Sequence, residues 1–333
     1  MILTLTPNPS LDRTVTLPGQ LQRGAVNRLG SVTVEPGGKG VNVARVLASS
    51  GQEATAVVPA ADHDPLLAAI DSLHVAALSR VAVPVAGAAR INTAVTEPDG
   101  TTTKLNEPGA GLSASEVAAV EQALLETLQA DRGTGADSGG AHSWAVLSGS
   151  LPPGAPDDWY VRLVTLLRPA GVRIAVDTSD APLAALAAAL PDTAPDLIKP
   201  NGEELAQLTG AGATDLEDRA KAGDLQPVVD AARLLVSLGI GAVMVTLGPA
   251  GGVLVTADGA WHATAPDVPV ISTVGAGDSS VAGYVLADVR GGDEAERLAT
   301  AMAYGSAAAG LPGTTLPTPA DLPSQAASVT RLS

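Results

Sequence analysis

The stretch Thr273-Val274-Gly275-Ala276-Gly277-Asp278-Ser279 decides how the rest of this chain is interpreted. Small residues precede a carboxylate and the apolar segment 280–289 follows, which predicts a tight turn that opens a helix. Free N–H groups at a helix start bind anions, and small residues let a phosphate come close. Asp278 would lie beside that anion, as a base placed for phosphoryl transfer to a hydroxyl. An ordinary capped helix after a glycine-rich loop would have the same pattern.

Composition limits the possible classes of protein. The chain has 333 residues, of which 46% are hydrophobic and only 2% aromatic. That length suits one large α/β domain, or a domain with a small insertion, built on Ala, Val and Leu. Cysteine is absent, which excludes a disulfide framework, a thiolate zinc site and a cysteine nucleophile. The net charge of −16 argues against nucleic acid and anionic membranes as partners.

The negative charge is uneven along the chain. Residues 1–110 hold 8 Lys/Arg and 9 Asp/Glu, whereas residues 111–333 hold 11 and 26. The few cations of the N-terminal third could surround an anionic ligand, although random scatter would give the same counts. The first residues, MILTLTP, lack the charged start and apolar run of a signal peptide, so we expect a cytoplasmic protein. The uncharged run 234–257 is broken by Gly and Pro, which predicts strands and turns rather than a membrane span.

Strands and helices alternate along most of the chain. Apolar runs predict strands at 2–5, 53–59, 143–147, 172–176, 196–198 and 242–246, and a hairpin at 251–264. Helical periodicity predicts helices at 41–50, 64–73, 115–129, 157–167, 181–190, 203–208, 227–238, 280–289 and 293–309. This alternation predicts an α/β fold with a parallel sheet covered by helices on both faces.

Two pairs of alternating segments interrupt this order, at 13–17 with 27–35 and at 89–97 with 101–105. Pro98-Asp99-Gly100 predicts a hairpin within the second pair. We expect both pairs to form a small separate sheet, like a lid on the main sheet.

The expected domain organisation is a single domain over 1–333, with a lid formed by about 12–36 and 88–107. The Gly-rich segment 131–141 is predicted to be a surface loop without a chemical role. The Pro- and Thr-rich segment 311–333 is predicted to be peripheral, with a short helix near its end.

Small-residue turns follow several of the expected strands. They are Gly37-Gly38-Lys39-Gly40, Ser148-Gly149-Ser150-Leu151-Pro152, Lys199-Pro200-Asn201-Gly202-Glu203-Glu204 and Thr246-Leu247-Gly248-Pro249-Ala250-Gly251. Several of them, all at the carboxyl ends of strands, would converge on one edge of the sheet, which is where open parallel sheets bind their ligands. The chain lacks the P-loop pattern Gly-x-x-x-x-Gly-Lys-Ser/Thr. It also lacks a Gly-x-Gly-x-x-Gly after the first strand, and this second absence disfavours a nicotinamide-dependent dehydrogenase.

Taken together, these residues resemble the PfkB/ribokinase-like carbohydrate kinase family over nearly the whole chain. The most specific motifs are the 273–279 stretch and Pro36-Gly37-Gly38-Lys39-Gly40-Val41-Asn42-Val43-Ala44-Arg45. Within the family the chain is most similar to the kinases of sugar phosphates, through Thr6-Pro7-Asn8-Pro9, Arg90-Ile91-Asn92, Thr103-Lys104-Leu105-Asn106-Glu107-Pro108-Gly109 and Lys199-Pro200-Asn201-Gly202-Glu203-Glu204-Leu205.

The resemblance implies a ribokinase-like fold and an ATP- and Mg²⁺-dependent kinase that converts fructose 1-phosphate to fructose 1,6-bisphosphate. Tagatose 6-phosphate and fructose 6-phosphate stay open as substrates. The alternative of another class is a sensor that binds a sugar phosphate without catalysis. The lid matches one that commonly packs against a second subunit in this branch, so the resemblance implies a homodimer through the lid.

The resemblance also implies residue roles. Asp278 would accept the proton of the attacking hydroxyl, with Gly275, Ala276 and Gly277 as the anion hole. The sugar phosphate would be bound by Asp12, Gly37, Gly38, Lys39, Asn42, Arg90 and Asn92. Its existing phosphate would face Lys39 and Arg90. ATP would be bound by Lys199, Asn201, Thr246, Gly248, Gly251, Gly277 and Ser306. Mg²⁺ would be held through water by Glu204, in the family's Asn-x-x-Glu pattern.

Elementary electrostatics adds two expectations. A carboxylate at a helix N-terminus keeps a low pKa, so Asp278 is predicted to be an ionised, weak base at neutral pH. Arg90 can bind a phosphate through two N–H groups, whereas Lys39 acts as a point charge. The structural alternative for Arg90 is a surface ion pair on an edge strand.

Overall fold

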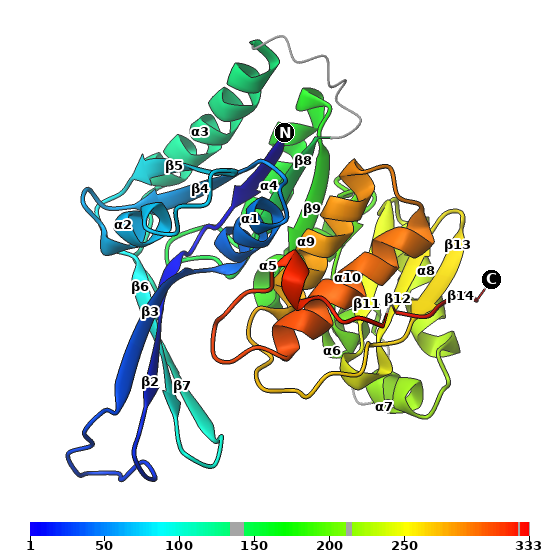
Figure 1. Ribbon diagram of the computed structural model, residues 1–333. Coiled ribbons are helices and arrows are strands. Elements are labelled where there is room, and N and C mark those ends of the chain that lie inside the picture. Colours follow the sequence, from blue (N-terminus) through cyan, green and yellow to red (C-terminus); the bar gives the residue numbers. More distant parts are fainter. Residues whose placement is uncertain (134–142, 211–214, 326, 333) are drawn as a thin grey trace.

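The structure is a computed structural model that describes residues 1–133, 143–210, 215–325 and 327–332. Its centre is a ten-stranded sheet in the order β14-β13-β12-β11-β10-β9-β8-β1-β4-β5 (Figure 1). The strands from β11 to β5 are parallel, and β12, β13 and β14 continue the sheet in antiparallel pairs. The strand bounds are β1 Ile2–Leu5, β4 Ala54–Ala60, β5 Leu78–Pro84, β8 Trp144–Ser148, β9 Arg173–Asp177, β10 Leu197–Ile198, β11 Ala242–Thr246, β12 Gly252–Thr256, β13 Gly259–Ala263 and β14 Val329–Arg331.

Helices cover both faces of this sheet. Their bounds are α1 Lys39–Ser49, α2 Pro65–Asp71, α3 Ala114–Gly133, α4 Trp159–Leu167, α5 Asp180–Ala188, α6 Gly202–Thr209, α7 Asp215–Lys221, α8 Gln226–Ser237, α9 Ala276–Val289 and α10 Glu294–Ala309. Successive residues of a strand point to opposite faces, so Leu3 and Leu5 pack in the core with α3, α4 and α8, whereas Ile2 packs with α1, α9 and α10. The predicted parallel sheet between two helical layers is confirmed.

A separate four-stranded sheet projects from this body (Figure 1). Its order is β3-β2-β6-β7, with β2 at Ser10–Thr16, β3 at Ser31–Gly37, β6 at Arg90–Thr96 and β7 at Thr102–Asn106. These are the segments expected to form the lid sheet.

The lid sheet is fixed to helix α1 through Arg45. The Arg45 side chain, 10% exposed, donates to the carbonyl of Pro36 at 2.7 Å and forms an ion pair with Glu35 at 3.1 Å. Glu35 also accepts a 2.6 Å hydrogen bond from Thr314, which connects the C-terminal segment to the same strand. The lid sheet, helix α1 and the C-terminal segment are therefore tied together although they are distant in sequence.

Three expectations need correction. Strand β5 was missed because Arg80 and the terminal Pro84 interrupt its apolar pattern. Helix α7 was missed because its sequence, DLEDRAK, has only two apolar residues, Leu216 and Ala220, facing the core. The last segment forms an edge strand, β14, after a 3-10 turn at Pro319–Asp321, where we expected a short helix. The unpaired edge of β13 supplies hydrogen-bond partners that the local sequence does not reveal.

Two more observations concern the expected loop and membrane segments. Helix α3 continues to Gly133, so the expected loop at 131–141 begins later, and its remainder, 134–141, lies outside the described residues. None of the helices in the described ranges is long and apolar enough to cross a bilayer.

Candidate active site

The 273–279 stretch forms the predicted turn and helix start. Helix α9 begins at Ala276 after Gly275, which has a left-handed backbone with φ of 76°. A Cβ on Gly275 would lie 2.8 Å from the Leu316 side chain, and one on Gly277 would lie 3.2 Å from Nζ of Lys199. No side chain caps this helix, and the Ala276 N–H makes only a long, 3.4 Å hydrogen bond to the Thr273 carbonyl. The N–H groups of Gly277 and Asp278 are therefore available to an anion close to the Lys199 ammonium.

Asp278 lies in the first turn of α9 and is only 7% exposed. Its Oδ2 accepts a 2.8 Å hydrogen bond from Nδ2 of Asn42, on helix α1. Burial raises the pKa of Asp278 to about 6, although Lys39 acts in the opposite direction. The expected low pKa is therefore wrong, because desolvation of the carboxylate outweighs the helix N-terminus. The ionised form still predominates at pH 7, and it is a stronger base than an ordinary aspartate.

Asp177, at the carboxyl end of β9, forms ion pairs with two lysines, Lys39 and Lys199. Its Oδ2 lies 3.2 Å from Nζ of Lys39 and its Oδ1 lies 3.3 Å from Nζ of Lys199. The Asp177 side chain is 2% exposed. Burial alone would raise the pKa of Asp177, but the two lysines hold it below its ordinary value. Asp177 was not among the predicted site residues, although it directly follows the expected strand 172–176, and a position after a strand is the signal that identified the other turns.

Lys39 is consequently a partly exposed cation among carboxylates, with 37% of its side chain accessible. Burial acts to lower the pKa of Lys39, but Asp177 and Asp278 raise it above the ordinary value. Its ammonium donates a 3.2 Å hydrogen bond to Asp177. It is placed where it can offset negative charge near Asp278.

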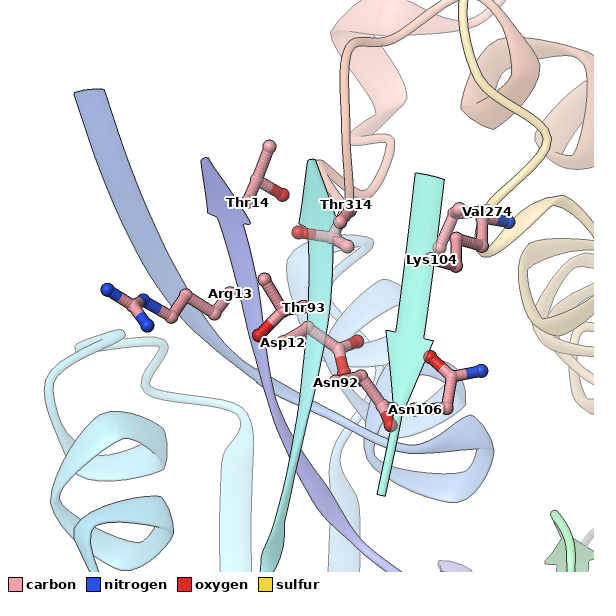
Figure 2. Close-up of a pocket in the computed structure, with 10 residues that line it drawn as sticks. Asp12, Arg13, Thr14, Asn92, Thr93, Lys104, Asn106, Val274 and Thr314 are labelled. Atoms are coloured by element: carbon pink, nitrogen blue, oxygen red, sulfur yellow. Dashed lines mark hydrogen bonds between the residues drawn. The ribbon is translucent and has the colours of Figure 1, made fainter. Parts of the chain in front are cut away.

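The lid supplies Asp12 and Asn92 to a pocket of about 150 Å³ (Figure 2). Asp12 on β2 pairs in register with Asn92 on β6, and its Oδ1 accepts hydrogen bonds from Ser10 at 2.7 Å and Asn92 at 3.1 Å. A Cβ on Gly37 would lie 2.2 Å from Oδ2 of Asp12, so this position requires glycine. Gly38 follows as the residue that precedes helix α1. The pocket therefore presents carboxylate and amide groups suited to sugar hydroxyls.

Arg90 lies at the base of the lid, half-buried and weakly bonded. Its contacts to the carbonyl of Glu107 and to Oγ of Ser150 are long, at 3.5 and 3.4 Å, and its Nε has no partner. It forms no ion pair in the part of the chain that the structure describes. Strand β6 is an interior strand of the lid, so the alternative of an edge-strand ion pair is wrong. A guanidinium in this state can accept an anionic ligand.

A second cavity, of about 480 Å³, opens on the other side of the 273–279 turn. It is lined by five of the residues expected on the ATP side, namely Thr246, Gly248, Gly251, Gly277 and Ser306. Met302, Gly305 and Val270 add an apolar surface. The volume is in the range of about 300–1,000 Å³ found for small-molecule sites. Lys199 and Asn201 lie next to this cavity rather than on its wall, since Asn201 bridges to Thr246.

Asn201 and Glu204 form the start of helix α6. Asn201 Oδ1 accepts from the Glu204 N–H at 2.7 Å, and Glu204 Oε2 accepts from the Asn201 N–H at 2.9 Å. This capping box explains the spacing of the two residues by helix chemistry alone. Among the residues that the structure describes, no three His, Cys, Asp or Glu residues gather as a metal cage.

The fold is that of the ribokinase-like carbohydrate kinases. The pattern described as pfkB family carbohydrate kinase matches residues 8–321, and the chain belongs to this family. A 1-phosphofructokinase of Rhodobacter capsulatus is 37% identical over 99% of this chain and 96% of its own length. One from Xanthomonas campestris is 35% identical over 90% and 88%. The crystal structure of phosphofructokinase-2 from Escherichia coli in complex with substrates and products has a TM-score of 0.82 at 31% identity, covering 96% of both chains.

Proposed function

We propose that the protein transfers the terminal phosphoryl group of ATP to the 6-hydroxyl of fructose 1-phosphate, giving fructose 1,6-bisphosphate. The main observation in support of this proposal is that residues of the 273–279 turn line both cavities. Val274 lines the lid pocket, whereas Ala276 and Gly277 line the larger cavity. A donor and an acceptor on opposite sides of one anion-binding turn would meet at Asp278. The names of the sequence relatives support this choice of sugar.

The residues imply the following chemistry. Asp278 takes the proton of the 6-hydroxyl as that oxygen forms a bond to the γ-phosphorus of ATP. The bond from this phosphorus to the bridging β–γ oxygen breaks, and ADP leaves with the electron pair. The N–H groups at the start of α9 and the ammonium groups of Lys39 and Lys199 stabilise the charge of the moving group. A phosphoryl transfer of this kind depends mainly on positioning and electrostatics.

We assign a Mg²⁺ site to Glu204. Mg²⁺ keeps several waters and is commonly bound by one or two carboxylates together with substrate phosphates. Glu204 is hydrogen-bonded to Asn201, which pairs with Thr246 on the wall of the larger cavity, and one carboxylate in this position fits that mode better than an all-protein cage. Bound there, the ion would neutralise charge on the nucleotide phosphates. We also assign the protein to the cytoplasm, where ATP is supplied.

Replacing Arg90 by Ala is expected to raise KM for the sugar phosphate about tenfold or more, with KM for ATP nearly unchanged. The reason is the loss of a charge-assisted contact to the existing phosphate, worth about 1.5–3 kcal/mol. Steady-state kinetics with each substrate varied in turn measures both constants. Equal increases in the two KM values would mean that Arg90 has a structural role.

The sugar itself is tested by comparing kcat/KM for fructose 1-phosphate, fructose 6-phosphate and tagatose 6-phosphate. We expect at least a tenfold preference for fructose 1-phosphate, and a smaller preference would refute the assignment. Binding of all three without turnover would favour the non-catalytic sensor. The buried base with a raised pKa favours the enzyme, because a sensor gains nothing from that cost.

We further propose that the protein is a homodimer through the lid. Val32 and Val34 alternate with Thr33 and Glu35 on β3, so they face away from Asp12, and they are 48% and 51% exposed. Leu105 on β7 shares this outer face and is 59% exposed. Exposed apolar side chains on a sheet face favour association. Light scattering should give twice the chain mass, and Val34→Lys with Leu105→Lys should give the monomer. A monomeric wild type would contradict the proposal.

A further inference from the structure

Lys104, on strand β7, extends from the inner face of the lid into the pocket that holds Asp12. It pairs in register with Ala94, and Ala94 pairs with Thr14, so small side chains surround its stem. Figure 2 shows Lys104 beside Val274, whereas the guanidinium of Arg13 points away from the pocket. The chain contains four lysines, of which Lys39 and Lys199 lie at the floor of the site and Lys221 lies on α7.

Lys104 has no internal partner to explain this position. It forms no ion pair or side-chain hydrogen bond with any of the described residues. Thr314, on the opposite wall, donates its hydroxyl to Glu35 rather than to the pocket. The Lys104 ammonium is therefore free for an anionic group of a ligand.

Its position along the lid identifies which anionic group it can reach. Arg90 lies at the base of β6, while Lys104 is level with Ala94, four residues further along that strand. Four residues of extended chain span about 13 Å. Arg90 is beside Ser150, and Lys104 is beside Val274, which directly precedes the anion-binding turn. Arg90 and Lys104 thus lie at opposite ends of the region where the sugar phosphate, the acceptor of the phosphoryl group, would bind.

We propose that Lys104 binds the phosphoryl group at the reaction end of the sugar, where it arrives from ATP, and not the phosphate that the substrate already carries. This inference rests on the proposed function, and it assigns the two phosphates of the product to different cations. Arg90 holds the phosphate that enters with the substrate. Lys104 approaches the transferred group from the lid, opposite the N–H groups of α9, and forms or breaks no bond itself.

The test is a comparison of two ligands without ATP, by calorimetric titration. Wild-type protein should bind both fructose 1-phosphate and fructose 1,6-bisphosphate. Lys104→Met should weaken the bisphosphate about tenfold or more, since a charge-assisted contact is lost, and change the monophosphate by less than about twofold. Arg90→Ala should weaken both ligands. Lys104→Arg should keep most of the bisphosphate affinity.

Lys221→Met is the matched control for the loss of one lysine charge, because Lys221 is exposed and pairs with Asp218 on a remote helix. It should change neither affinity. If Lys104→Met weakens both ligands equally, or neither, the inference is wrong while the proposed function stands. If the wild-type protein prefers another sugar phosphate, the same comparison with that substrate and its product tests Lys104. If the wild type binds no sugar phosphate, both the proposed function and the inference are wrong.

Discussion

Replacing Asp278 by Asn is expected to lower kcat by about two to four orders of magnitude while binding of the sugar phosphate persists. The amide cannot accept the hydroxyl proton, but it has the same shape and can still accept the hydrogen bond from Asn42. Single-turnover kinetics measures the chemical step, and a titration with the sugar phosphate measures binding. Activity within tenfold of the wild type would mean that another group is the base.

The same carboxyl sets an expected pH profile. Asp278 must be ionised to act, and burial raises its pKa to about 6. kcat/KM should therefore fall as the pH drops through about 6 and should level off above pH 7. A profile that stays flat down to pH 5 would contradict the assignment, since an ordinary aspartate would still be ionised there.

Asp278→Asn should also make the protein more stable at pH 7. A carboxyl with a raised pKa favours the folded state when protonated, and this stabilisation is lost as the pH rises from the ordinary value to about 6. Two pKa units correspond to about 3 kcal/mol, so the neutral amide should raise the unfolding free energy by up to that amount. Denaturant unfolding of the variant and the wild type at pH 7 and pH 4 measures this difference in unfolding free energy. The difference should be smaller at pH 4, where the wild-type carboxyl is protonated in the folded state.

Replacing Asp177 by Asn is expected to damage both folding and catalysis. The change leaves Lys39 and Lys199 without their shared carboxylate, and removing one partner of a buried ion pair costs about 3–5 kcal/mol. The two ammonium groups should then repel each other and lose their positions beside the anion-binding turn. We expect kcat to fall at least about a hundredfold, comparable to the loss of one oxyanion-hole donor.

Denaturant unfolding separates the two effects of Asp177→Asn. The folded-state pKa of Asp177 lies below its ordinary value, so its stabilisation is present above that ordinary value and disappears as the pH falls through the folded-state pKa. The difference in unfolding free energy between the variant and the wild type should be largest at pH 7 and small in acid. Asp71→Asn, which breaks a surface pair with Arg80, is the control and should have little effect. If the Asp177→Asn variant keeps the stability and the kcat of the wild type, Asp177 does not hold Lys39 and Lys199 in place.

The local sequence was sufficient to predict the structure of a segment where that structure depends on the segment's own residues. The 273–279 stretch predicted a tight turn and a helix start with a carboxylate in the first turn, because small residues and a following apolar run encode that turn by themselves. The parallel sheet was predictable for a similar reason, since most of its strands are apolar runs, although Arg80 concealed β5. Strand β14 was not, because its pairing depends on the edge of β13, about 70 residues earlier.

The sequence by itself thus determined the fold class, the turn at Gly275 and the candidate base Asp278. Tertiary structure decided the protonation chemistry of that base, because its pKa depends on burial and on Lys39 and Asp177, which arrive from other elements. It also decided that Lys39 and Lys199 share one carboxylate, and that Lys104 stands about 13 Å from Arg90 along the lid. Desolvation and Coulomb interactions depend on distances in space, and separation along the chain does not fix those distances.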